Sequence, residues 1–449
     1  ITTLGSNDPL WVVDGVVVDE GGIGFLNQSD IASVEVLKDA ASQAIYGARA
    51  AAGVIFITTK KGKSGKLNVN LNSYIGVSSA SRKLDLLNAT EYATLLNEKS
   101  VNGEGNVLFS DPASFGEGTD WQSIIFNNSA MRSQHELSLS GGNDKSKFYA
   151  SFGFNEQEGI VMSDISNYTR KNIRLNSTHD ISEKLRFGQT LGYSNEKNIG
   201  IGNTNSEFGG PLSSAINLDP LTPVVERDPI FANQAPYTNN GIWKDANGHP
   251  YGISSIVAQE MSNPLAYQES RRGNYGWADN FVGNAYLEYE PIEGLKLRST
   301  IGAKLAYWGY KSFTPVSYLN ASTVVTQNNI SQGTNRGLGW NLENTISYSK
   351  TFDKHNFSML LGQGVYVDNN SFGENVTYYD IPVDNYKQAS FNFSVPQDQI
   401  VASSYEGIEH RVTSLFSRLT YDYDEKYLLT AIFRRDGSSR FGANNKFGF

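Results

Sequence analysis

Long alternating segments constrain the fold of this 449-residue chain more than any other feature. Large apolar side chains alternate in them with small or polar ones, which is the side-chain period of a β-strand. In residues 295–307, Leu297, Ile301 and Leu305 share one phase, and charged residues occupy the other. About eleven such segments of roughly ten residues occur, whereas globular strands usually span about five or six. Strands that cross a bilayer need about nine to eleven residues, so the pattern favours a membrane-spanning sheet. The segments are 67–77, 148–155 and 295–307, with others near Leu139, Leu175, Leu191, Leu287, Leu342, Leu361, Leu419 and Leu429.

The connections between these segments are sorted by length. Short turns at 141–145, 179–184, 291–294, 353–356 and 422–426 alternate with long connections at about 79–130, 195–275, 309–333 and 369–409. The connection at 156–167 is of intermediate length. Outer-membrane barrels have short turns at one end and long loops at the other, whereas a soluble sandwich has no reason to sort its loops.

Charged residues in the segments avoid the apolar phase. A lipid-facing Lys or Arg at the bilayer midplane costs about 2–4 kcal/mol, whereas a barrel interior is polar. We therefore expect the charged phase to face inward, with Gln189, Asn344 and Gln363 as exceptions on the apolar phase. The charged residues are Glu136, Arg174, Arg186, Glu288, Lys296, Arg298, Lys304, Glu343 and Arg418.

Composition and motifs exclude several other classes. The 37 Lys and Arg against 46 Asp and Glu give a formal net charge of −9, which argues against nucleic acid as a partner. The chain has no cysteine, and its five histidines lack metal-ligand spacing. No phosphate loop or nucleophile elbow is present, so we predict neither an enzyme nor a cofactor. Loops rich in Asp and Glu leave a Ca²⁺ site open, although no EF-hand pattern is found.

Residues 1–62 differ from the rest and predict a small α+β module. We expect strands at 11–18, with a turn, at 31–37 and at 53–59, and a short helix at 38–46 that ends at Gly47. The expected core of the module is Ile31, Val34, Val36, Ile45, Val54 and Ile57.

Four motifs resemble one family of transporters. Residues 30–62 (DIASVEVLKDAASQAIYGARAAAGVIFITTKKG) closely resemble the end of the plug domain of TonB-dependent transporters, and residues 9–16 (PLWVVDGV) resemble the preceding plug strand. Residues 84–92 (LDLLNATEY) and 434–442 (RRDGSSRFG) resemble signatures of the SusC/RagA branch. One departure is Ala52, where the branch often has Asn before Gly53.

The resemblance implies an all-β transmembrane barrel of 22 strands with a small α+β plug in its lumen. Residues 1–62 would be the C-terminal part of the plug, and residues 63–449 would be the N-terminal half of the barrel with long extracellular loops. Because an open edge is not viable in lipid, we expect a partial chain, with the TonB box and an N-terminal extension before Ile1.

The resemblance also implies a role and partners. The chain would belong to an importer in the outer membrane of a Gram-negative bacterium of the Bacteroidetes type. A SusD-like surface lipoprotein would cap the barrel, a glycan or peptide would be the substrate, and TonB would drive remodelling of the plug. The transporter and lipoprotein pairs could also form dimers. Two alternatives stay open: a siderophore or cobalamin receptor, and a surface adhesin or scaffold that transports nothing.

Candidate contact residues follow from chemistry. Aromatic faces stack on sugar rings and cover peptide side chains, so the longest loop supplies the expected substrate contacts. The aromatic residues singled out there are Phe208, Tyr237, Trp243 and Tyr251, although packing within the loop is a competing explanation. In the plug, Asp14, Glu35 and Arg49 are the polar candidates. We expect Glu35 and Arg49 to pair with each other or with wall charges, rather than with substrate.

Overall fold

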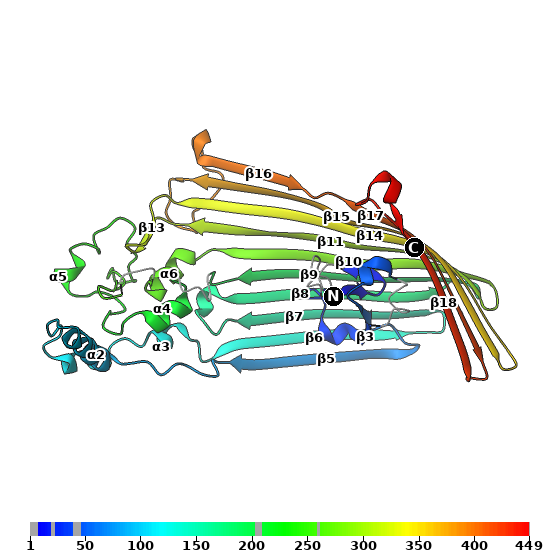
Figure 1. The fold of residues 1–449 in the computed structure, drawn as a ribbon, viewed down its shortest axis with the longest axis horizontal. Helices are drawn as coiled ribbons and strands as arrows, with labels where there is room; N and C mark the ends of the chain where they lie inside the picture. The colour runs from blue at the N-terminus through cyan, green and yellow to red at the C-terminus, as the bar shows by residue number, and fades with distance from the viewer. Residues whose placement is uncertain (1–7, 19–22, 39–45, 203–208, 258–260, 449) are drawn as a thin grey trace.

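A curved antiparallel sheet dominates the computed structural model, which describes residues 8–18, 23–38, 46–202, 209–257 and 261–448 (Figure 1). The sheet has 13 strands, in the order β19-β18-β17-β15-β14-β11-β10-β9-β8-β7-β6-β5, with β16 on β15. All eleven predicted segments form long strands of this sheet. They are β5 (Gly65–Ser78), β6 (Ala130–Gly142), β7 (Ser146–Glu158), β8 (Asn167–Asp180), β9 (Leu185–Ile199), β10 (Tyr275–Ile292), β11 (Leu295–Thr314), β14 (Asn329–Phe352), β15 (His355–Tyr379), β17 (His410–Tyr423) and β18 (Tyr427–Ser438).

Short turns lie at one end of this wall and long connections at the other (Figure 1). The turns at this end are tight, and residues in them such as Asp353 and Gly294 adopt positive φ. Asp and Gly tolerate this conformation better than most residues. Some strands continue into segments for which the sequence predicts loops: β11 runs to Thr314, β14 begins at Asn329, and β15 runs to Tyr379. The connection after β11 therefore spans only 315–328, and the one after β15 spans 380–409.

The long connections contain short elements of their own. The first has α2 (Ala89–Asn102), η3 (Pro112–Phe115) and α3 (Trp121–Ile125), and the β7–β8 connection has η4 (Ser163–Ile165). The longest has α4 (Pro211–Asn217), α5 (Pro229–Ala232) and α6 (Pro264–Arg271). The others have β12 (Ser317–Asn320), β13 (Thr323–Val325), η5 (Gln397–Gln399) and β16 (Ile400–Glu406). The last described elements are η6 (Ala443–Asn445) and β19 (Phe447–Gly448).

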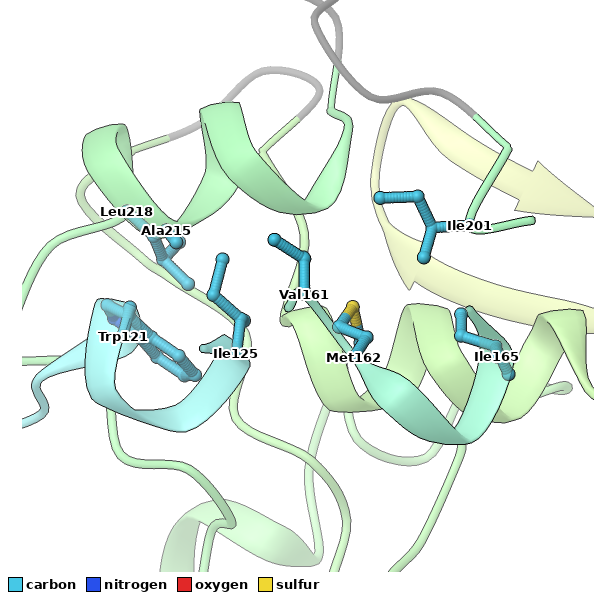
Figure 2. Close-up of a cluster of buried hydrophobic side chains, with 8 residues drawn as sticks. All are labelled: Trp121, Ile125, Val161, Met162, Ile165, Ile201, Ala215 and Leu218. Atoms are coloured by element: carbon cyan, nitrogen blue, oxygen red, sulfur yellow. The ribbon is translucent and has the colours of Figure 1, made fainter. Parts of the chain in front are cut away.

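A buried apolar cluster joins three of these connections (Figure 2). Trp121 and Ile125 of α3 pack with Met162 of the β7–β8 connection and with Ala215 of α4. The indole nitrogen of Trp121 also donates to the carbonyl of Asp219 at 3.0 Å. The loops at this end therefore have a core of their own, as far as the described residues go.

The N-terminal module is a four-stranded sheet with the order β2-β1-β4-β3. Its elements are β1 (Leu10–Val13), β2 (Val16–Val18), η1 (Gln28–Asp30), β3 (Ile31–Leu37), η2 (Gly47–Ala50) and β4 (Val54–Thr59). Strand β1 pairs in parallel with β4, and β3 pairs antiparallel with β4. The predicted strands are confirmed, whereas the expected helix falls largely on residues 39–45, outside the described part of the chain.

The expected core of the module is only partly correct. Val54 and Ile57 are fully buried, and Ile31 is half-buried. Val34 and Val36 are more than 50% exposed, because β3 is the edge strand of the small sheet and has β4 as its partner on one side. Ile45 lies outside the described residues.

The module packs against one face of the wall, which we call the inner face. Val282 of β10 joins a cluster with Val13, Val16 and Ile57 of the module. A Cβ at Gly302 would approach a Val16 methyl to 2.9 Å, so glycine allows β2 to lie close to β11. The inner face therefore contains the contact between the two parts of the fold.

The strand register confirms the predicted sorting of charges. All nine charged residues share the inner face with the residues that contact the module. The apolar phase lies on the outer face, where Ile301 is 55% exposed. Asn344 and Gln363 also lie on the outer face, where their amides hydrogen bond at 3.1 Å. No helix among the described residues has the length and hydropathy to span a membrane.

The two faces provide a direct test of sidedness. Ile301 lies beside Leu342 on the outer face, whereas Thr300 lies opposite Glu343 on the inner face. If the outer face contacts lipid, Ile301→Lys should lower the free energy of unfolding in bilayers by about 2–4 kcal/mol. Thr300→Lys, the matched control, should have little effect because its ammonium faces a carboxylate. Urea unfolding in lipid vesicles measures both, and equal effects would contradict the assignment of faces.

Candidate functional site

A buried arginine of the wall lies between two carboxylates of the module. Arg174 of β8 is 4% exposed, and its guanidinium lies 3.6 Å from the Asp14 carboxylate and 3.7 Å from the Asp30 carboxylate. Asp14 is in the tight turn between β1 and β2, with φ of 50°, and Asp30 ends η1. Two separate parts of the module therefore meet one cation of the wall.

Hydrogen bonds satisfy the groups around this cation. The Asp14 carboxylate accepts from the backbone N–H of Thr59 at 2.9 Å and from its hydroxyl at 2.6 Å. The Asp30 carboxylate accepts from the Tyr149 hydroxyl at 2.8 Å and from the Ser151 hydroxyl at 2.6 Å. Charged groups can be buried when they are paired and hydrogen-bonded in this way, so the contact fixes the module in one position.

Wall amides extend the same contact. Asn176 of β8 donates to the Thr59 hydroxyl at 2.9 Å and to the Lys60 carbonyl at 2.6 Å. Asn284 of β10 donates to the Asp14 carbonyl at 2.6 Å. The turn after β1 and the end of β4 are thus both held by the wall.

A second contact joins η2 of the module to β18. A Cβ at Gly47 would overlap a carboxylate oxygen of Asp436 and lie 2.6 Å from the Arg434 guanidinium, so a larger residue there would have to displace these two side chains. The φ of Gly47 is also positive, at 69°. Arg434 donates to Asp436 at 2.8 Å and to the Ser414 hydroxyl at 2.7 Å. The signature at 434–442 therefore includes residues that contact the module.

The predicted plug residues have different surroundings. Asp14 is in the buried contact described above. Arg49 lies over the ring of Tyr366 of β15, 4.2 Å from its centroid, and burial lowers the pKa of its guanidinium. Glu35 is exposed on β3, and no ion pair joins it to Arg49 within the described ranges. Arg49 therefore contacts the wall through an aromatic ring, whereas the sequence predicts that it pairs with Glu35 or with wall charges.

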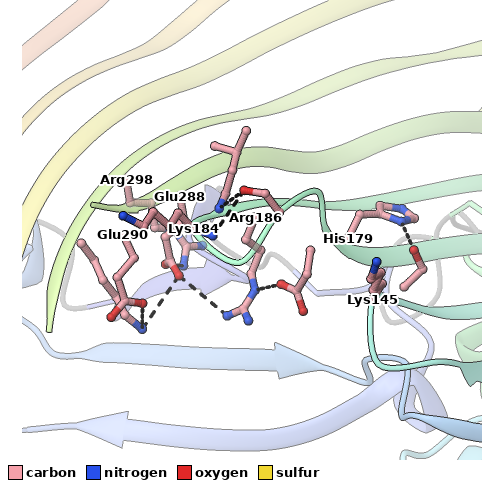
Figure 3. A network of polar contacts seen from close by, with 12 residues as sticks. Lys145, His179, Lys184, Arg186, Glu288, Glu290 and Arg298 are labelled. Carbon is pink, nitrogen blue, oxygen red and sulfur yellow. Dashed lines mark hydrogen bonds and ion pairs between the residues drawn. The ribbon is translucent and has the colours of Figure 1, made fainter. Parts of the chain in front are cut away.

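Charged residues also cluster near the turn end of the inner face (Figure 3). The Glu288 carboxylate is 15% exposed and lies 3.6 Å from Arg298, 3.7 Å from Arg186 and 3.9 Å from Lys296. Arg186 also pairs with Asp180 at 2.6 Å. These cations are about 40% exposed, so each pair contributes little to stability, about 0–1 kcal/mol.

Trp243 and Tyr251, two of the predicted loop aromatics, lie side by side, since the Tyr251 N–H donates to the Trp243 carbonyl at 3.0 Å. Tyr237 packs within the loop: its hydroxyl accepts from the Ile253 N–H at 3.0 Å, and burial raises its pKa. Trp243 lines a cavity of about 350 Å³. Phe208 lies outside the described residues.

Sequence reasoning did not single out several residues of the module–wall contact. Asp30 and Thr59 are in the resembling motif, but nothing in its pattern shows which residues meet the wall. The sequence places Arg174 on the inward-facing phase but does not identify its partners. No group of three or more His, Asp or Glu side chains in the described ranges is arranged to hold a metal.

Removing the buried cation should loosen the module. Arg174→Met leaves the Asp14 and Asp30 carboxylates buried without their counter-ion, which should cost about 3–5 kcal/mol. Arg186→Met is the matched control at an exposed pair and should cost no more than about 1 kcal/mol. Hydrogen exchange of the module amides measures both variants. Equal protection in the two variants would exclude a central role for Arg174.

The contact at Gly47 can be separated from its backbone strain. Gly15→Ala provides the control, because φ there is 87° but nothing lies within 4 Å of the added Cβ. Positive φ alone should cost about 1–2 kcal/mol in either variant. Gly47→Ala should cost clearly more and should increase protease cleavage of the module. A Gly47→Ala variant that behaves like Gly15→Ala would show that η2 does not need this close approach.

Comparisons with known proteins agree with this arrangement. Residues 1–54 match the family model described as the TonB-dependent Receptor Plug Domain. The chain is 32% identical over 458 residues to TonB-dependent receptor P3 of Formosa agariphila, covering 99% of this chain and 40% of that protein. It is 29% identical over 464 residues to TonB-dependent receptor SusC of Bacteroides thetaiotaomicron, covering 99% of this chain and 43% of that protein.

A solved structure shares the fold. The structure of the RagAB peptide transporter matches with a TM-score of 0.78 at 23% identity, covering 99% of this chain and 50% of that chain. The chain thus spans about 40% of the length of the curated relatives it matches. The plug match, the identity over the whole chain and the shared fold together show that this chain belongs to the SusC/RagA-type TonB-dependent transporters.

Proposed function

We propose that the protein imports a nutrient, an oligosaccharide or a peptide, across the bacterial outer membrane in a TonB-dependent manner. The observation that carries this proposal is the plug module on the inner face of the wall, held there by the buried Arg174, Asp14 and Asp30. A module placed there could couple substrate binding by the loops at one end of the wall to the action of TonB at the other end. The relatives named SusC and TonB-dependent receptor support the same role.

The proposed mechanism uses the contacts of the plug. A SusD-like lipoprotein would close over the long loops, and substrate bound between lipoprotein, loops and plug would bias the plug position. TonB would then pull on the plug and break its polar contacts with the wall. The contacts at Asp14 and Asp30 are directional, so a small displacement would remove several hydrogen bonds together. We propose no catalysed reaction and no cofactor; a loop Ca²⁺ and a dimer of transporter–lipoprotein pairs stay open.

Uptake in the native host tests the proposal. Cells should take up a labelled oligosaccharide or peptide, and deletion of tonB should abolish that uptake. Deleting residues 9–62 should remove coupled uptake and produce ion conductance in planar bilayers, because the plug would no longer occupy the lumen. Unchanged uptake and no conductance in the deletion would overturn transport and favour a scaffold or adhesin.

Growth tests separate the remaining alternative. If the protein were a siderophore or cobalamin receptor, its loss would limit growth on iron chelates or cobalamin. The SusC-type relatives argue against this role. Loss of the protein should impair growth on an oligosaccharide or peptide mixture and leave growth on iron chelates unchanged. The reverse pattern would favour the receptor alternative.

A further inference from the structure

Glu136 of β6 is a buried carboxylate of the inner face that the contact at Arg174 does not use. The residue is 4% exposed, and one of its carboxylate oxygens is shielded from solvent without a hydrogen-bond partner among the described residues. The residues outside the described ranges contain no Lys, Arg or His side chain that could pair with it. A buried charge without a partner is unfavourable, so Glu136 destabilises the arrangement in which the plug is in place.

The strand register places Glu136 near Arg174 on the same face. Glu136 lies opposite Gly153 of β7, and Arg174 of β8 lies opposite Ser151, two residues away from Gly153. Ideal sheet spacing puts the two Cα atoms about 12 Å apart, a distance that extended glutamate and arginine side chains can bridge. Among the described strands, no other inner-face carboxylate lies nearer to Arg174 in the register.

The β7 residues between these two charges are small, and the module fills the space above them. Ser151 donates to Asp30 at 2.6 Å, and a Cβ at Gly153 would lie 3.0 Å from the amide nitrogen of Asn27. Asn27 directly precedes η1, and Asp30 ends it. The amide of Asn172 of β8 also leans over Gly153. The segment around η1, together with this amide, therefore separates the two charges while the plug is in place.

Displacement of the plug would change the surroundings of Arg174. Its guanidinium would lose both carboxylates of the module, and it lies beside Gly192 of β9, which has no side chain to bind it. Arg170, the neighbouring cation on β8, lies directly opposite Glu196 of β9 and so keeps a wall carboxylate as its neighbour. Arg174 is therefore the cation of this strand that loses its carboxylate partners when the plug moves.

We propose that Glu136 is a second counter-ion for Arg174 and forms an ion pair with it when the plug is displaced. The new pair gives a partner to a carboxylate that has none in the plugged state, and it offsets part of the free energy lost with the two module carboxylates. The exchange of partners would thus lower the work that TonB must supply. This inference rests on the proposed displacement of the plug during import and assigns a wall residue to that step.

Hydrogen exchange of the plug amides in the purified native protein, held in lipid vesicles, measures how readily the plug opens. Glu136→Gln removes both the second counter-ion and the buried charge, so it should reduce the equilibrium constant for plug opening about tenfold. Glu183→Gln makes the same change of charge in the exposed turn between β8 and β9 and should leave opening unchanged. Thermal melting checks that each variant is folded.

A double-mutant cycle separates pairing from the simple removal of a buried charge. In the Arg174→Met background, the carboxylate of Glu136 has no guanidinium to meet after the plug opens. Glu136→Gln should therefore reduce opening in this background by about threefold or less.

Two results would overturn the ion pair. One is a Glu136→Gln variant whose plug opens as readily as that of the native protein, or more readily. The other is an equal reduction in both backgrounds, which would show that Glu136 acts only as a buried charge or as the ligand of a bound cation.

Uptake assays keep the two proposals apart. TonB-dependent uptake of a labelled nutrient, with no coupling between the two positions in the cycle, would remove the ion pair and leave import standing. Coupling in the cycle without any TonB-dependent uptake would support the ion pair and remove the import function.

Discussion

The position of the plug depends on one buried cation. Arg174 is almost fully buried, and removing its charge from water costs free energy. The adjacent Asp14 and Asp30 carboxylates, which also accept hydrogen bonds, offset this desolvation cost. Such a cluster is sensitive to position, because each group loses its partners when the module shifts. Apolar packing around Val282 can tolerate small displacements, whereas the polar contact cannot. The ion pairs of Arg174 therefore determine the position of the plug, and the apolar packing around Val282 adds binding free energy that depends less on position.

The sorted faces of the wall give that cluster its setting. Because side chains alternate along every strand, the same segment can present apolar groups outward and charged groups toward the module. Residues as far apart in sequence as Asp14 and Asn284 meet on this inner face. The long connections lie at one end of the wall, and they have an apolar core of their own around Trp121. The plug contact on the inner face and the loop cavity thus lie at different positions along the same sheet.

Much of the fold follows from the sequence, and the site follows far less. Period and length predicted all the long strands, since these signals repeat along each segment. The burial of Val34 and Val36 was predicted wrongly, because an apolar alternation does not reveal that β3 is an edge strand. Arg174 was assigned to the correct face, but its partners are more than a hundred residues away. Contacts of that kind depend on the register of the whole sheet, which no local pattern encodes.

The amide pair on the outer face has a consequence for assembly of the wall. Asn344 and Gln363 satisfy part of each other's hydrogen-bonding capacity only when β14 and β15 pair in the observed alignment. A slip of two residues would keep every side chain on its proper face, so hydrophobic sorting alone would not oppose it. It would, however, leave both amides without a partner in an apolar environment. The hydrogen bond between these two polar side chains thus favours the native register of β14 and β15 over a register shifted by two residues.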